Sequence, residues 1–141
     1  MIVEYSVSTD NNKFVVKDRA GKYEIDLRIR LFEFSKNIFH TIFKLPQKRE
    51  YDVFRIQLSR SATAIGANYE EAQASSVKEF RQRIQICLRE TRETNYWLRL
   101  IMDIVPNKNQ KMSLDLRGLI RESEELMKIF GAISTKLKDI K

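Results

Sequence analysis

Glycine and proline are scarce in this sequence, which has four glycines and two prolines among 141 residues. Long stretches therefore contain no residue that breaks a helix, and this favours an all-α domain over a β-sandwich or a βαβ fold. The length fits one domain. The 43% share of hydrophobic residues is enough for a core of ordinary size.

Cysteine and histidine occur once each, as Cys87 and His40. A single cysteine excludes an internal disulfide and fits a reducing compartment, so we expect a cytoplasmic protein in which Cys87 is a small buried hydrophobe. His40 has no second histidine or cysteine within helical reach, so no metal or other cofactor is expected. No apolar run is long enough to cross a bilayer, and no basic segment followed by an apolar one opens the chain; a membrane partner is not expected.

The clearest helical pattern covers residues 77–105, directly after the turn at residues 74–76. Ser76 is placed to cap the free amides of this helix, with Glu79 three residues later. One face carries apolar or small polar residues at spacings of three and four. They are Val77, Phe80, Ile84, Leu88, Thr91, Asn95, Leu98, Met102 and Val105.

A second apolar group lies on roughly the opposite side of the same helix, at about 100° per residue. It consists of Ile86, Trp97, Leu100 and Ile104. A helix in a small monomer needs only one buried face, so we expect this group to form the interface with another copy of the chain.

Three more helices are predicted, at residues 23–44, 49–74 and from Ser113 onward. In the first, Ile25, Ile29, Phe32, Phe39 and Phe43 lie beside the core row of Leu27, Leu31, Phe34, Ile38, Ile42 and Leu45, which predicts a broad apolar face. In the second, small residues surround Gly66 and indicate a bend or a tight helix contact. With short links, the chain is predicted to be an all-α, up-and-down antiparallel four-helix bundle over residues 21–141.

Residues 1–20 have a different pattern. Val3, Tyr5 and Val7 alternate with polar residues, and Asp10 begins a turn sequence before a second apolar run. Two structures fit this pattern: a short hairpin, or a mobile or partner-docked arm.

Lysine and arginine exceed aspartate and glutamate by 26 to 19, which gives a net charge of +7. Such an excess is compatible with RNA, DNA or another polyanion as partner. The third helix carries a basic stripe between its two apolar faces, formed by Arg81, Gln85, Arg89, Arg92, Tyr96 and Arg99. Guanidinium groups with an interleaved aromatic ring suit phosphate contacts and base stacking. A solvated face, with Arg89 paired to Glu93, or ion pairs between subunits explain the stripe equally well.

Polar residues also lie near the predicted core faces of the second and third helices. They are Ser61, Asn68, Thr91, Thr94 and Asn95. We interpret them as a hydrogen-bonded layer that fixes the register of the helices, with a small pocket as the alternative.

Catalytic motifs are missing from the sequence: there is no phosphate loop, paired-glycine nucleotide motif, zinc spacing or nucleophile elbow. The carboxylates of Glu70, Glu71, Glu79, Glu90 and Glu93 could form a cluster in principle. A di-metal bundle would need two histidines, however, so pairing with arginines such as Arg83 and Arg89 is the preferred interpretation. No enzymatic activity is expected.

Three segments of the chain carry distinctive motifs: residues 60–72 read RSATAIGANYEEA, residues 76–80 read SVKEF, and residues 88–100 read LRETRETNYWLRL. Together they resemble a bacterial family of four-helix-bundle proteins first noted as encoded in intervening sequences of 23S ribosomal RNA genes. The resemblance extends over about residues 23–140. Its signature positions are Asn68, Glu71, Glu93, Tyr96, Trp97 and Leu98.

The resemblance implies a bundle that assembles into a homopentameric ring and has no established enzymatic activity. A relative, the accessory variability protein of diversity-generating retroelements, is a basic pentamer that binds nucleic acid and a reverse transcriptase. We therefore expect a non-enzymatic, homo-oligomeric scaffold that binds RNA or DNA through its basic surface. The alternative is a protein-protein interaction module without a nucleic-acid role.

Overall fold

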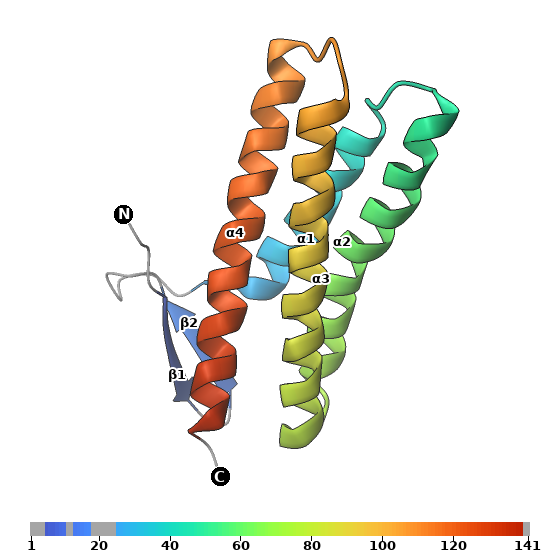
Figure 1. The fold of residues 1–141 in the computed structure, drawn as a ribbon. Helices are drawn as coiled ribbons and strands as arrows, with labels where there is room; N and C mark the ends of the chain where they lie inside the picture. Colours follow the sequence, from blue (N-terminus) through green and yellow to red (C-terminus); the bar gives the residue numbers. More distant parts are fainter. Residues whose placement is uncertain (1–4, 11–12, 18–24, 140–141) are drawn as a thin grey trace.

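Four helices make up most of the structure, a computed structural model that describes residues 5–10, 13–17 and 25–139. They are α1 (Leu27–Ile42), α2 (Asp52–Ala72), α3 (Val77–Ile104) and α4 (Gln110–Lys138), with a short 3-10 helix η1 (Arg49–Tyr51) before α2. Successive helices run in opposite directions and pack side by side (Figure 1), and α4 also contacts α1. The predicted all-α antiparallel four-helix bundle is confirmed.

The start of α3 agrees with the prediction, because the Ser76 hydroxyl accepts a hydrogen bond from the Glu79 amide at 3.3 Å. The cap of α4 was predicted four residues too late, at Ser113. Asn109 is its cap, and Asn109 Oδ1 accepts from the Met112 amide at 2.8 Å. An asparagine caps as well as a serine does, so the earlier of two possible caps starts this helix.

The first two helices are shorter than predicted. The predicted start of the first at Tyr23 lies outside the described residues; α1 begins at Leu27, where Asp26 Oδ1 accepts from the Ile29 amide at 3.2 Å. Residues 49–51 of the predicted second helix form η1, and α2 ends at Ala72. No helix in the described ranges is both long enough and apolar enough to cross a membrane.

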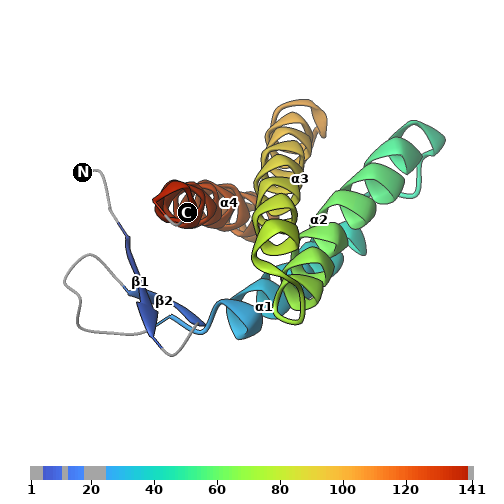
Figure 2. The same cartoon turned by 90° about the horizontal axis from the view of Figure 1, so that it is seen from below.

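The core lies along the axis of the bundle, which is seen end-on in Figure 2, and receives one row of side chains from each helix. Its largest fully buried members include Leu31, Leu58, Ile84 and Phe130. Cys87 is also fully buried, with its sulfur 3.4 Å from the Ile65 carbonyl oxygen. Burial raises the pKa of the Cys87 thiol to about 12. The thiol therefore stays protonated at neutral pH and is no nucleophile.

The contact between α1 and α2 is made through small residues of α2. The Ser35 hydroxyl donates to the Ala62 carbonyl oxygen at 3.2 Å. A Cβ added at Gly66 would lie 3.8 Å from Leu31 Cβ, which is ordinary van der Waals distance. The prediction that Gly66 marks a tight contact is therefore wrong, because an alanine side chain fits there.

Gly66→Ala should raise the free energy of unfolding by up to about 1 kcal/mol, since alanine loses less backbone entropy than glycine in a helix interior. The measurement is urea denaturation followed by circular dichroism. Gly131→Ala is the reference, because a Cβ added at Gly131 in α4 meets no atom within 4 Å. Destabilisation by Gly66→Ala, with stabilisation by Gly131→Ala, would show that the α1–α2 contact is tighter than described.

The chain before α1 forms a hairpin of β1 (Ser6–Asp10) and β2 (Lys13–Lys17), paired antiparallel with Val7 opposite Val16. The hairpin lies beside α4 (Figure 1), and Val16 is buried in the core. Between the two alternatives for residues 1–20, the described part of this segment is therefore an ordered hairpin. Its Asn11 and Asn12, like residues 1–4 and 18–20, lie outside the described residues.

A polar cluster fastens this hairpin to the bundle. The Tyr5 hydroxyl donates to Glu125 Oε2 of α4 at 2.7 Å, and the Arg30 guanidinium of α1 lies 5.9 Å from the centre of the Tyr5 ring. Arg30 also donates from Nε to Glu122 Oε2 of α4 at 2.9 Å. The strands need such a cover, because an isolated two-stranded hairpin is only marginally stable.

Tyr5→Phe removes the hydroxyl and keeps the ring over Arg30. We expect a loss of about 0.5–1.5 kcal/mol in hairpin docking, the usual net contribution of one hydrogen bond. Amide hydrogen exchange would show faster exchange in β1 and β2 and no change in α2 and α3. Equal acceleration throughout the chain would contradict a local role for this contact.

Candidate nucleic-acid interface

The predicted polar layer lies between α3 and its two neighbours. Thr94 Oγ1 donates to Ser61 Oγ of α2 at 2.9 Å, and Asn95 Nδ2 donates to Ser123 Oγ of α4 at 2.9 Å. Thr91 Oγ1 donates to the carbonyl oxygen of residue 87, one turn earlier, at 2.7 Å. Each of these side chains is buried and has a partner. The arrangement fits a layer that fixes helix register, as buried polar groups with complete hydrogen bonding do.

Asn68 lies apart from this layer. It is half-buried near the end of α2, where its Nδ2 donates to the Ala64 carbonyl oxygen at 2.8 Å. Its Oδ1 accepts from Arg83 Nη1 of α3 at 2.9 Å. Ser123 completes the layer on the α4 side and was not predicted as one of its members. It lies among the buried apolar residues of α4, between Leu119 and Leu126. A serine within an apolar row was the signal for its role.

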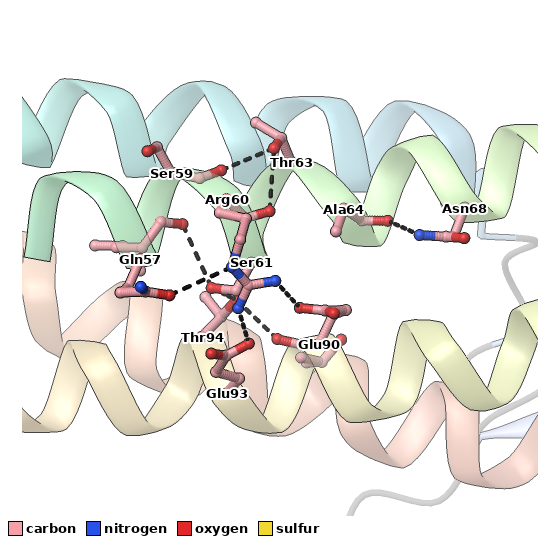
Figure 3. A network of polar contacts seen from close by, with 12 residues as sticks. Gln57, Ser59, Arg60, Ser61, Thr63, Ala64, Asn68, Glu90, Glu93 and Thr94 are labelled. Carbon is pink, nitrogen blue, oxygen red and sulfur yellow. Dashed lines mark hydrogen bonds and ion pairs between the residues drawn. The ribbon is translucent and has the colours of Figure 1, made fainter. Parts of the chain in front are cut away.

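Two carboxylates of α3 are held by one arginine of α2. Arg60 Nη1 lies 3.3 Å from Glu90 Oε2, and Arg60 Nη2 pairs with Glu93 (Figure 3). Arg60 Nε donates to Gln57 Oε1 at 3.3 Å. Burial raises the pKa of Glu90, and the neighbouring Glu93 adds to this effect against the opposing charge of Arg60. One guanidinium thus pairs with two carboxylates, so the cluster has one more acidic group than basic groups.

Arginine pairing follows the prediction at one position and departs from it at another. Arg83 forms the expected ion pair, with Nη2 at 2.8 Å from Glu71 Oε2. Arg89 was expected to pair with Glu93, four residues away on α3. Arg60 reaches Glu93 from α2 instead. Arg60, which competes with Arg89 for Glu93, lies on another helix, and residue spacing within α3 cannot predict a partner from α2.

The basic stripe follows the edge of α3 that faces α4. Gln85 Nε2 donates to the Ser134 hydroxyl of α4, and Arg92 and Arg99 follow at intervals of seven residues. Residues seven apart lie on nearly the same side of a helix. The stripe therefore runs along the outside of the α3–α4 contact for most of the length of α3.

Two residues at the ends of the stripe are held within the fold. Arg81 Nη2 donates to the Leu137 carbonyl oxygen near the end of α4 at 2.9 Å. Arg99 Nε donates to Asn95 Oδ1 at 2.8 Å, and its guanidinium lies 5.9 Å from the centre of the Tyr96 ring. These contacts fix the ends of the stripe and the ring between them.

The middle of the stripe is different. Arg89 and Arg92 are exposed, and neither forms a hydrogen bond or ion pair with any part of the chain that the structure describes. Tyr96, one turn beyond Arg92, is 50% exposed. α4 also carries two arginines, Arg117 and Arg121, which are exposed and likewise unbonded within the described ranges. The sequence shows the α4 arginines only as an excess of positive charge over residues 107–141.

The predicted interface row of α3 is partly covered by α2. The Trp97 ring packs edge-on against Phe54 of α2, with 6.3 Å between ring centres, and its Nε1 is buried without a hydrogen-bond partner among the described residues. Ile86 and Leu100 are half-buried, and Ile104 is 51% exposed. Trp97 thus belongs largely to the packing of its own chain. The rest of the row is partly accessible.

A metal site is not found where the structure describes the chain: no three or more of its His, Cys, Asp and Glu side chains are close enough together to hold an ion. His40 is exposed on α1, away from Cys87 in the core. Glu90 and Glu93, the closest pair of acids in the Arg60 cluster, are already neutralised in part by that arginine.

Comparison with solved structures finds the same fold in a protein of unknown function from the S23 ribosomal protein family of Bacteroides thetaiotaomicron. The two share 28% sequence identity with a TM-score of 0.67, and the match covers 77% of this chain and 97% of the other. No curated protein matches the sequence. A sequence model described as 23S rRNA-intervening sequence protein matches residues 24–131. The segments at residues 60–72, 76–80 and 88–100 all lie within this match, and the chain belongs to the 23S rRNA-intervening sequence protein family.

Proposed function

We propose that the protein is a non-enzymatic, homo-oligomeric scaffold that binds nucleic acid, RNA or DNA, through the basic stripe of α3. The observation that carries the proposal is the pair Arg89 and Arg92, exposed and unpaired beside the half-exposed ring of Tyr96. A guanidinium without an internal carboxylate is free to contact phosphate oxygens in bidentate fashion. The adjacent ring offers a surface on which a base can stack.

The distribution of ion pairs supports this location. Arg28, Arg30, Arg60 and Arg83 pair with carboxylates and hold α1, α2, α3 and α4 together. Arg89 and Arg92 of α3 have no such partner among the described residues, and the same is true of Arg117 and Arg121 of α4 and Arg49 of η1. An unneutralised stripe on α3 would be repeated in every subunit of an oligomer.

The chemistry of the stripe and of the buried thiol is the reason why the proposed function includes no catalysis. The charged side chains of the stripe are arginines, whose guanidinium groups donate hydrogen bonds and accept none. The only thiol is buried, with a pKa raised to about 12. In the proposed function the arginines of the stripe hold an anionic partner, and no catalytic step is assigned to them.

Fluorescence anisotropy with a labelled single-stranded RNA and a duplex DNA tests the proposal. Binding should weaken steeply between about 50 and 200 mM salt, since each phosphate contact releases a counterion. Arg89→Gln with Arg92→Gln should lower the slope of log affinity against log salt by about 0.7–0.9 for each arginine.

The matched control is Lys48→Gln with Arg49→Gln, which removes the same charge from exposed positions at the start of η1. It should leave the slope nearly unchanged. Equal losses in both double variants would show that only net charge matters and would contradict a defined stripe. No binding of either nucleic acid at low salt would reject the proposal and favour the alternative, a protein-protein interaction module.

A further inference from the structure

The outer face of α1 carries large apolar side chains that the bundle leaves uncovered. Ile29 is 63% exposed, Phe32 is 70% exposed and Phe43 is 71% exposed. Phe39 is half-buried, with its ring centre 6.1 Å from that of Phe43. These residues form what we call the α1 outer face, and Phe32, Phe39 and Phe43 border a shallow hollow of about 340 Å³ together with Ser35, Lys36 and His40.

This face is separate from the core face of the same helix. At about 100° per residue, the row of Ile29, Phe32, Lys36, Phe39 and Phe43 lies roughly 150° around α1 from the buried row. The prediction of one broad apolar face is therefore wrong: the helix has two. The row containing Leu31, Phe34 and Ile38 is buried in the core, and of the outer row only the half-buried Phe39 packs against the core.

The spacing of the outer row is that of a helix-packing seam. Its members stand three, four, three and four residues apart, the pattern by which one helix packs along another. Lys36 is its only charged member, and the Lys36 ammonium also pairs with Glu33 at 3.1 Å. The seam therefore fits an apolar helix that brings a carboxylate near Lys36, and it does not fit a polyanion.

The exposed area is large enough to form the centre of a stable interface. At about 200 Å² for each phenylalanine, Phe32 and Phe43 alone expose roughly 280 Å². A standard protein interface buries about 800 Å² on each partner, with an apolar centre and a polar rim. The α1 outer face supplies such a centre, with Arg28, Glu33 and His40 exposed near it.

A complementary surface exists on α3 of the same chain. Ile86, Glu90, Glu93, Trp97, Leu100 and Ile104 repeat the same alternation of four and three residues. Its apolar members Ile86, Leu100 and Ile104 are half-buried or exposed. Its acids, Glu90 and Glu93, share the single guanidinium of Arg60, so this pair has one more acidic group than Arg60 can balance.

We propose that the α1 outer face of one copy docks on the Ile86–Ile104 row of α3 in a second copy, with Lys36 beside Glu90 and Glu93. The inference rests on the homo-oligomeric part of the proposed function and names the surfaces that meet. Two different faces make a heterologous contact, which repeats from copy to copy and closes into a ring if the rotation allows. The basic stripe lies beside the α3 row, so assembly would align the stripes of successive copies.

Two single variants and their mixture test the docking by light scattering. Phe32→Glu should abolish assembly through α1 and Ile104→Glu should abolish it through α3, so each alone should give the 16.7 kDa monomer mass. Mixed in equal amounts, they should form a dimer. The intact α3 row of the first variant can still accept the intact α1 face of the second, and the contact cannot extend further.

Leu114→Glu on α4 is the control, because Leu114 is 53% exposed and belongs to neither surface. This variant should keep the native mass. Circular dichroism should show native helix content for all three variants, since the replaced side chains are at least half exposed.

Three results would overturn the inference. A native mass for Phe32→Glu or Ile104→Glu would show that the altered surface is not the interface. A mixture that stays monomeric would show that α1 does not meet α3. A native chain that is itself a monomer would also remove the homo-oligomeric part of the proposed function, whereas the first two results leave that part and the nucleic-acid titration unaffected.

Discussion

Burial of apolar surface by α1 is the constraint on which the rest of the account depends. Each helix of a four-helix bundle turns one face inward, and α1 uses the row of Leu31, Phe34 and Ile38 for this purpose. Its other apolar face then points outward, where no part of the described chain covers Phe32 or Phe43. Water contact with two phenylalanine rings is unfavourable at about 25 cal/mol per Å² of apolar surface, so a partner that covers them gains that free energy.

α3 contributes most of the other interactions in the bundle, because each of its sides faces a different neighbour. Toward the core it supplies Ile84 and Leu98; toward α2 it offers Thr94 and the acids held by Arg60. Toward α4 it offers Asn95 and Gln85. The sides that remain outward carry the basic stripe and the Ile86–Ile104 row. Interior hydrogen bonds and ion pairs thus fix the register of the bundle, and that register decides which charges stay unpaired.

The helical content was predictable from sequence because it depends on local signals. Few glycines and prolines, the three-and-four spacing of apolar residues and the Ser76 cap are all properties of neighbouring residues. The buried set of Ser61, Thr91, Thr94 and Asn95 was predictable for the same reason, since periodicity alone places them inward. Even the error at the start of α4 was local, a choice between Asn109 and Ser113 as cap.

The site was less predictable because it depends on contacts between helices. Helix periodicity places the two apolar rows of α1 about 150° apart, but it does not show which row enters the core once α2 and α4 are in place. The pairing of Arg60 with Glu93, which leaves Arg89 free, requires the register of α2 against α3. The partial cover of Trp97 by Phe54 requires the same information. Charge and spacing indicate the type of surface, and tertiary packing decides which residues remain available on it.

Hydroxyl-radical footprinting of the native protein tests the central claim, that another copy covers the outer face of α1 in solution. Tyr96 is the internal reference, since it is 50% exposed and lies outside both proposed docking surfaces. The account predicts that Phe32 and Phe43, although 70% and 71% exposed in the single chain, are protected from oxidation relative to Tyr96 and lose this protection on dilution. Rapid oxidation of Phe32 and Phe43 at every protein concentration would contradict it.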